Sequence, residues 1–244
     1  MSHNQKLKNA PLKEVILEIT WEDSIDEFGN KFDSGFELAQ GIFAEKLKEK
    51  FPIHKKLYNN NQQVKFGTPI HQYWMSELEW PVIQHGQGIL SINQTEDKYL
   101  WNDFKNLVNE IVGLLFSSYS DNILINRISL EYFDAFDVPD SQTYKFIEDN
   151  LQTSLCTQYN LPGQLDGLKI NKNYLQEDNS LLSISISDAV NDFTKKEVVI
   201  MVTSGIIEEN NLNENFDSKL EKLHKLCSDA FKTILNKDYY GSLN

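Results

Sequence analysis

The residue types best suited to chemistry in this sequence are a histidine beside two glycines and a single arginine. His85, Gly86, Gln87 and Gly88 follow one another, and this composition predicts a turn between two strands. Turn glycines expose backbone N–H groups that can bind an anion, and a turn would place His85 within reach of a ligand. Arg127 is the only arginine, and a guanidinium holds a carboxylate or phosphate with two parallel hydrogen bonds. We interpret the segment from His85 to Gly88 as a plain hairpin turn, and a small-ligand site near His85 and Arg127 is the alternative.

Arg127 also belongs to a charged pattern. Arg127 and Glu131 are four residues apart in an expected strand, so they share a face, and Glu14 and Glu18 share a face of the first expected strand. If these two strands lie side by side, Arg127 meets Glu18 or Glu14. Such a pair is either a structural ion pair or part of a charged groove that binds a partner.

Aromatic residues gather around the central strands and the helix that follows them. Trp101 and Tyr132 belong to this group. Most such rings form the core, but one or two on an open sheet face would anchor a partner. We therefore include Trp101 and Tyr132 among the candidate binding residues.

The patterns that define catalytic and metal sites are missing from the sequence. It contains no HxH, HExxH, GxSxG or CxxC, and no GK[ST] follows the glycine turn. Cys156 and Cys227 are its only cysteines, and sparse cysteine fits a reducing compartment better than a disulfide framework. We predict no catalytic residue, no metal and no cofactor.

Charge and hydropathy restrict the partners and the location. The 244 residues include 23 Lys+Arg and 36 Asp+Glu, a net charge of −13. This balance argues against a general nucleic-acid binder, because neutralising phosphates needs clustered cations. It also argues against docking on an anionic membrane. No signal-like start and no run of 18 apolar residues occurs, so we expect a soluble cytoplasmic protein.

Hydrophobic periodicity predicts an α+β fold whose element order repeats. The first half has expected strands at 13–21, 53–58, 71–79, 82–84 and 89–92 and helices at 36–50 and 99–119, and the second has strands at 123–136, 165–170, 181–187 and 197–203 and helices at 141–151 and 216–235. Residues 22–35 are expected to form a loop, with Ser34 as the cap of the next helix, and Thr95 or Asp97 is expected to cap the helix at 99–119.

This order divides the chain into residues 1–11, a flexible arm, and two β-α-β(3-4)-α halves, 12–120 and 121–244, within one compact unit. Each half would be an antiparallel sheet with its long helix packed on one face. Joined edge to edge, the halves would form one curved sheet, the element order of the duplicated TATA-binding-protein saddle. An ordinary α+β domain whose order happens to repeat is the alternative.

Four short segments together resemble a sporadically distributed prokaryotic family of similar length with no assigned activity. That family has an opening APLxE strand, a QxGxGxL turn, a central RxxLRY strand and a last helix with His and Phe seven apart. The matching residues here are Pro11, Glu14, Glu18, Gln84, Gly86, Gly88, Leu90, Tyr99, Trp101, Phe104, Arg127, Leu130, Tyr132, His224 and Phe231. Glu131 departs from the pattern because it stands where the family has its second arginine. The resemblance implies an accessory role in mobile or defence-linked gene sets.

These observations favour a non-enzymatic binding or adaptor protein that acts through protein–protein contact in a bacterial accessory system, defence- or toxin-linked. The first alternative is a small-ligand sensor or enzyme with its site near His85 and Arg127. The second is a nucleic-acid binder that uses a TATA-binding-protein-like saddle. An exposed edge strand would also permit a homodimer.

Overall fold

The computed structural model describes residues 7–22, 24–59, 62, 64–77, 79–120, 123–139, 142–153 and 167–244. Its elements run in the following order: β1 (Leu12–Trp21), β2 (Ser24–Ile25), β3 (Lys31–Phe32), α1 (Phe36–Leu47), β4 (Ile53–Lys56), β5 (His71–Ser76), β6 (Glu79–Gly86), β7 (Ile89–Thr95), the 3-10 turn η1 (Glu96–Lys98), α2 (Trp101–Phe116), β8 (Ile125–Asp137), α3 (Thr143–Asn150), β9 (Lys169–Leu175), β10 (Leu181–Val190), β11 (Glu197–Glu208), α4 (Phe216–Ile234) and α5 (Lys237–Ser242). The predicted α+β class is confirmed.

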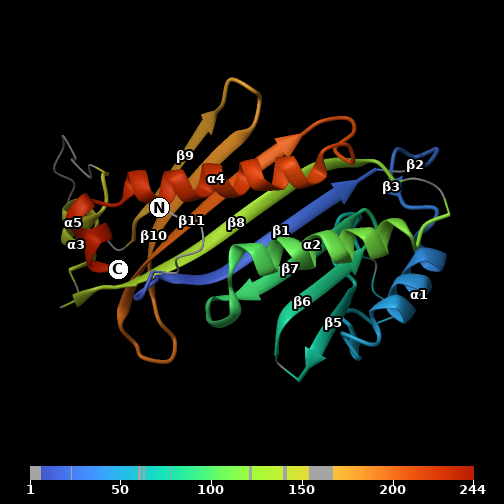
Figure 1. Ribbon diagram of the computed structural model, residues 1–244, viewed down its shortest axis with the longest axis horizontal. Coiled ribbons are helices and arrows are strands. Elements are labelled where there is room, and N and C mark those ends of the chain that lie inside the picture. Colours follow the sequence, from blue (N-terminus) through green and yellow to red (C-terminus); the bar gives the residue numbers. More distant parts are fainter. Residues whose placement is uncertain are drawn as a thin grey trace.

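One antiparallel sheet of nine strands forms the centre of the molecule (Figure 1). Its order is β4-β5-β6-β7-β1-β8-β11-β10-β9. The two long strands β1 and β8 pair along most of their length, with Leu17 opposite Leu130 and Glu18 opposite Ser129. Because β7 pairs with β1 and β11 pairs with β8, strands from distant parts of the sequence meet at the middle of one continuous sheet.

The alternation of apolar and polar residues determines which face of each central strand is buried. In β1, Val15, Leu17, Ile19 and Trp21 are buried, and the residues between them are half-exposed. Side chains alternate across a strand, so one face of β1 is entirely apolar. Burying that face against helices removes the apolar surface from water, the main favourable term in folding.

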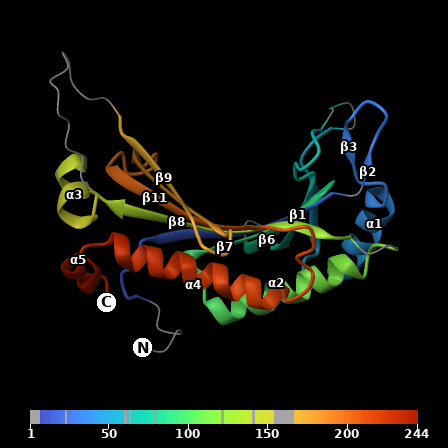
Figure 2. The same cartoon turned by 90° about the horizontal axis from the view of Figure 1, so that it is seen from above.

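The helices cover that apolar face. Figure 2 shows α2 and α4 side by side beneath the sheet, while the two ends of the sheet bend away from these helices. The buried side of α4 carries a regular apolar stripe of Phe216, Leu220, Leu223, Cys227 and Ala230. In the middle of the sheet the opposite face is concave, and no helix of the described residues lies over it (Figure 2); below we call it the open face.

Several local predictions differ from the structure. The predicted loop 22–35 contains the short β2–β3 hairpin, and α5 had no predicted counterpart. The expected caps are also corrected: Gly35 precedes α1 and Leu100 precedes α2, and neither residue donates or accepts a side-chain cap bond. Of the strand predicted at 165–170, residues 165 and 166 lie outside the described residues, and β9 begins at Lys169.

Backbone contacts hold the described part of the predicted N-terminal arm. The Asn9 N–H donates to the carbonyl of Leu243, and the Ala135 N–H donates to the carbonyl of Pro11. Residues 1–6 of that arm lie outside the described residues. Among the helices of the ranges given above, none is both long and apolar enough to cross a membrane.

Candidate functional site

The structure places His85 inside strand β6 and not in a turn. Its side chain is fully buried, and its ring centroid lies 5.0 Å from that of Phe43 and 5.1 Å from that of Phe36. Neither ring nitrogen has a hydrogen-bond partner. Burial lowers the pKa of His85 to about 3, and the neighbouring His71 adds to this shift. His85 is thus a neutral core ring between β6 and α1, with no exposed surface for a ligand.

The glycines of the turn allow a neighbouring segment of the chain to pack closely against it. The chain reverses at Gln87 and Gly88, and Gly88 has φ of +70°, a conformation that side chains with a Cβ rarely adopt. A Cβ at Gly88 would lie 2.1 Å from the ring of Phe66, and one at Gly86 would lie 2.1 Å from the carbonyl oxygen of Thr68. The segment around Phe66 therefore covers the turn. The interpretation as a plain hairpin turn is confirmed, with the reversal at Gln87 and Gly88, and the ligand-accessible turn that was the other interpretation is not observed.

Arg127 lies on the open face between two carboxylates. Its Nη1 donates to Oε1 of Glu18 at 2.8 Å, and its Nε lies 3.2 Å from Oε1 of Glu208. The predicted ion pair between Arg127 and Glu18 is confirmed, whereas Glu14 accepts a hydrogen bond from Asn93 instead. Two acidic partners for one guanidinium leave a net negative charge here, near the ends of β1 and β11.

Glu131 adds to that charge. It lies between Ile16 on β1 and Ser204 on β11 in the sheet register. Burial raises its pKa, the charge of Glu18 raises it further, and hydrogen bonding to Ser204 and the charge of Arg127 oppose this. The position that carries arginine in the resembled family is thus a half-buried carboxyl group beside the Arg127 cluster.

Apolar side chains surround these charges on the open face. Phe133 and Val202 are opposite each other on β8 and β11, and Ile206 is opposite Ser129. All three apolar residues, and Ile16 on β1, are half-exposed. Apolar surface that remains partly exposed in the middle of a sheet is typical of an interaction surface when it is contiguous.

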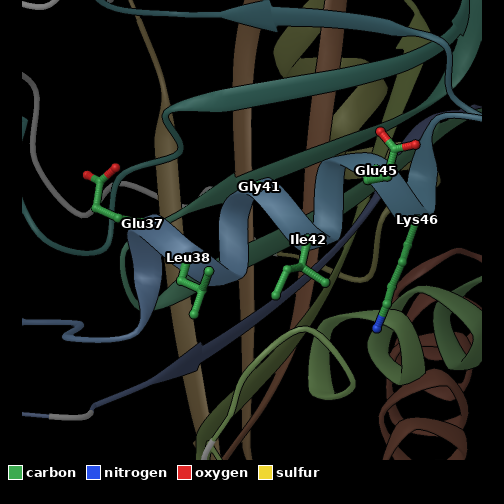
Figure 3. Close-up of a pocket in the computed structure, with 6 residues that line it drawn as sticks. All are labelled: Glu37, Leu38, Gly41, Ile42, Glu45 and Lys46. Carbon is green, nitrogen blue, oxygen red and sulfur yellow. The ribbon is translucent and has the colours of Figure 1, made fainter.

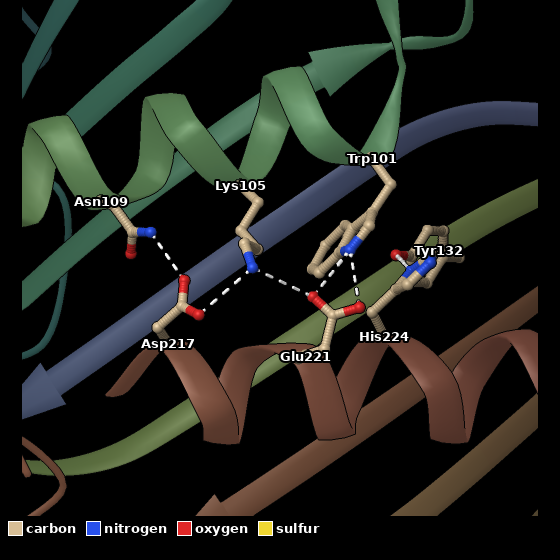
Figure 4. Close-up of polar contacts among 7 residues, drawn as sticks. All are labelled: Trp101, Lys105, Asn109, Tyr132, Asp217, Glu221 and His224. Carbon is tan, nitrogen blue, oxygen red and sulfur yellow. Dashed lines mark hydrogen bonds and ion pairs between the residues drawn. The ribbon is translucent and has the colours of Figure 1, made fainter. Parts of the chain in front are cut away.

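Trp101 and Tyr132 lie on the other side of the sheet, in a polar cluster between α2 and α4 (Figure 4). The Tyr132 hydroxyl contacts Nδ1 of His224 at 2.6 Å and the Tyr99 hydroxyl at 2.8 Å. The Trp101 ring stacks on His224 with a centroid distance of 3.8 Å, and its Nε1 donates to Glu221 at 3.0 Å. The cluster joins both long helices to β8.

Ion pairs extend the cluster along the two helices. Lys105 lies 3.2 Å from Asp217 and 3.3 Å from Glu221, and Asn109 donates to Asp217 at 2.8 Å. Sequence reasoning missed these partners, although their spacing was a signal. Residues 101, 105 and 109 share one face of α2, and residues 217, 221 and 224 share one face of α4.

The groups of this cluster hold the two long helices to β8, and their pKa values do not favour reactive forms. Burial raises the pKa values of Tyr99 and Tyr132, which keeps both hydroxyls protonated at neutral pH. Burial also raises the pKa of Cys227 to about 12, so its thiol is unreactive. Cys156 lies outside the described residues. Within the described ranges, no three His, Cys, Asp or Glu residues are grouped as a metal ion would require.

The candidate residues therefore fall into three separate places. Arg127 and Glu131 lie on the open face, Trp101 and Tyr132 lie between the helices and the sheet, and His85 with its glycines lies beneath α1 and the segment around Phe66. No model of a known protein family matches the chain, and no curated protein has a significantly similar sequence. Four of the fifteen residues that carry the resemblance, Tyr99, Trp101, Tyr132 and His224, form one cluster.

Proposed function

We propose that this chain is a non-enzymatic binding protein, an adaptor, which binds a protein partner on the open face of its sheet. The observation that carries this proposal is the set of half-exposed apolar side chains in register at the middle of that face, with Phe133 beside Val202. No described helix packs over them (Figure 2). A partner that covers Ile16, Phe133 and Val202 would remove this apolar surface from water.

The charge of the face specifies the partner further. Glu18, Glu131 and Glu208 outnumber Arg127 on this face. A partner with apolar side chains and a few Lys or Arg residues fits this pattern. A nucleic-acid backbone does not fit, because its phosphates would meet the carboxylates. A small-ligand function is also disfavoured, since His85 is sealed in the core and Arg127 already holds two carboxylates.

The topology supports an internal duplication as part of the same proposal. Within the nine-stranded sheet, the first strand of each half lies at the centre, the last strand lies next to it, and the earlier ones follow outward, whereas β2 and β3 form a separate hairpin. A duplicated unit would generate this order, and the curved sheet resembles a saddle with its helices on the convex side. We further propose a cytoplasmic location and a place in the resembled family, with its accessory, defence- or toxin-linked roles.

Affinity capture with matched variants tests the function. Four tagged chains would each be used to capture proteins from an extract of the native host. They are the unchanged chain, Phe133→Asp, Val202→Asp and the control Asn106→Asp, which lies on the exposed side of α2. We expect the unchanged chain and the control to recover one protein. The amount recovered should be at least tenfold lower with each of the two open-face variants. Calorimetric titration with the purified partner would then measure the affinity directly.

Two results would contradict the proposal. One is equal recovery of every protein by all four chains while thermal melting shows that the variants are folded. The other is a rise of the melting temperature with a nucleotide or metabolite and no protein recovered, which would favour the small-ligand sensor. Sedimentation of the purified chain as a dimer that Phe133→Asp dissociates would assign the open face to a second copy.

A further inference from the structure

Helix α1 has one buried side and one side in solvent. Phe36, Ala39, Phe43 and Leu47 are buried against the sheet. On the opposite side, Leu38 and Ile42 are 66% and 37% exposed. An apolar pair four residues apart on the solvent side of a helix does not contribute to the core of its own chain.

These two residues form part of a shallow pocket on α1 (Figure 3). Leu38, Gly41, Ile42 and Glu45 line it together with Glu37 and Lys46. The spacing of the first four is i, i+3, i+4 and i+7, and Leu38 and Ile42 project from the same side of the helix. Four residues at this spacing form the hole that accepts one side chain, the knob, of a packed partner helix.

Gly41 makes this pocket, and nothing within the described structure requires a glycine there. A Cβ at position 41 would have no atom within 4 Å. Glycine in the middle of a helix weakens it relative to alanine, so the residue is unfavourable for the helix and does not relieve any internal clash. Its absent side chain leaves room for close approach from outside.

Exposed apolar residues are concentrated around this helix. Five of the thirteen exposed large apolar side chains in the described part lie between residues 25 and 42: Ile25, Phe28, Phe32, Leu38 and Ile42. The first three belong to the β2–β3 hairpin segment, which lies at the same end of the molecule as α1 (Figures 1 and 2). Exposed apolar residues gathered at one end of a molecule are typical of an interaction surface when they are contiguous.

The charges beside the pocket indicate which kind of partner would occupy it. Glu37 and Glu45 flank it, and Lys46 is directed to α2, where its Nζ donates to the carbonyl of Ser117 at 2.5 Å. Glu45 has Lys48 at 3.4 Å, but both side chains are more than two-thirds exposed, and such pairs contribute little. A partner with basic residues is therefore favoured, whereas a second copy would bring Glu37 and Glu45 against their equivalents.

We propose that the outer side of α1 binds an amphipathic helix of a partner protein. An apolar side chain of that helix fills the pocket over Gly41, and Lys or Arg residues on its flanks pair with Glu37 and Glu45. This surface is separate from the open face, so the proposal stands independently of the function proposed above. With both surfaces occupied, the chain would connect two partners.

Synthetic peptides test this proposal. Two labelled 18-residue helices share one Leu/Ala seam, and one has Lys and the other Glu on its flanks. Fluorescence anisotropy measures their binding to the chain, to Gly41→Gln and to Gly113→Gln. Gly113 is the matched control, because it is exposed in α2 and a Cβ there would also have no atom within 4 Å. Both substitutions improve helix propensity, so both variants should fold.

We expect the Lys-flanked peptide to bind at least tenfold more tightly than the Glu-flanked one. Gly41→Gln should weaken it at least tenfold, Gly113→Gln should not, and Glu37→Lys with Glu45→Lys should reverse the preference. Equal affinity for both peptides, or no effect of Gly41→Gln, would overturn the proposal. Binding to phosphatidylglycerol vesicles, or self-association in sedimentation, that Gly41→Gln abolishes would also overturn it, by assigning the surface to lipid or to a second copy.

Discussion

Replacing Asp134 with asparagine should stabilise the fold much more at pH 8 than at pH 5. Asp134 lies on the helix-covered side of β8, opposite Met201, and its side chain is 4% exposed. Burial raises the pKa of Asp134 from 3.8 to about 7. A raised carboxyl pKa means that the folded chain binds the proton more tightly than the unfolded chain. Stability from this residue is therefore lost as the pH rises from about 4 to 7, and the loss is complete above pH 7.

The size of the effect follows from the difference between the two pKa values. Each pKa unit corresponds to about 1.4 kcal/mol, so keeping Asp134 ionised in the core costs about 4 kcal/mol at pH 8. At pH 5 the folded chain is protonated and the cost is below about 2 kcal/mol. Asparagine has nearly the same shape and no charge at either pH. Its stability advantage should grow by about 2 to 3 kcal/mol between pH 5 and pH 8.

Urea unfolding followed by tryptophan fluorescence at pH 5, 6, 7 and 8 measures this advantage. The histidines are the same in both chains, so their titration cancels in the difference. Asp137→Asn, at the exposed end of the same strand, is the matched control. The reasoning is that Asp134 becomes ionised in the core near neutral pH. It would be refuted if the difference in the free energy of unfolding between Asp134→Asn and the unchanged chain stayed constant from pH 5 to pH 8.

Two further substitutions test the region around the glycine turn. His85→Leu should stabilise the chain by about 2 kcal/mol more at pH 5 than at pH 8, because burial lowers the pKa of His85 to about 3 and stability is lost as the pH falls below 6.5; equal gains at both pH values in urea unfolding would contradict this. Gly88→Ala should cost about 2 to 5 kcal/mol, from its positive φ and the contact with Phe66. Gly29→Ala, with φ of +84° and open space, should cost only about 1 to 2 kcal/mol in the same assay, and equal costs would show that Phe66 moves aside.

Local periodicity was sufficient to predict the central elements. Alternation from Val15 to Trp21 predicted β1, and the apolar stripe from Phe216 to Ala230 predicted α4. The ion pair of Arg127 with Glu18 followed from spacing along two strands once they were placed side by side. These predictions succeeded because each depends on one face of one element, and a sequence displays that directly.

Predictions failed where distant segments decide the structure. Nothing near His85 shows that the segment around Phe66 covers the turn or that α1 closes over the ring. Ile83 and His85 share one face of β6, and counting His85 as an aromatic core residue would have extended the strand. The hydrogen bond from the Asp238 N–H to the Asn236 side chain shows that α5 had a recognisable cap. The partners of Trp101 needed the relative placement of two helices, which spacing alone does not provide.

The lysines on the outer strands are placed to oppose polymerisation through the edges of the sheet. A nine-stranded open sheet has two edges, β4 and β9, whose outer backbone groups are a template for another chain. Lys55 and Lys56 lie on one edge and Lys169 and Lys172 on the other. Edge-to-edge pairing of two copies would bring these cations together, and each would lose hydration. A chain with a net charge of −13 thus has positive charge at the two places where sheet extension would begin, and this protects it against fibre growth.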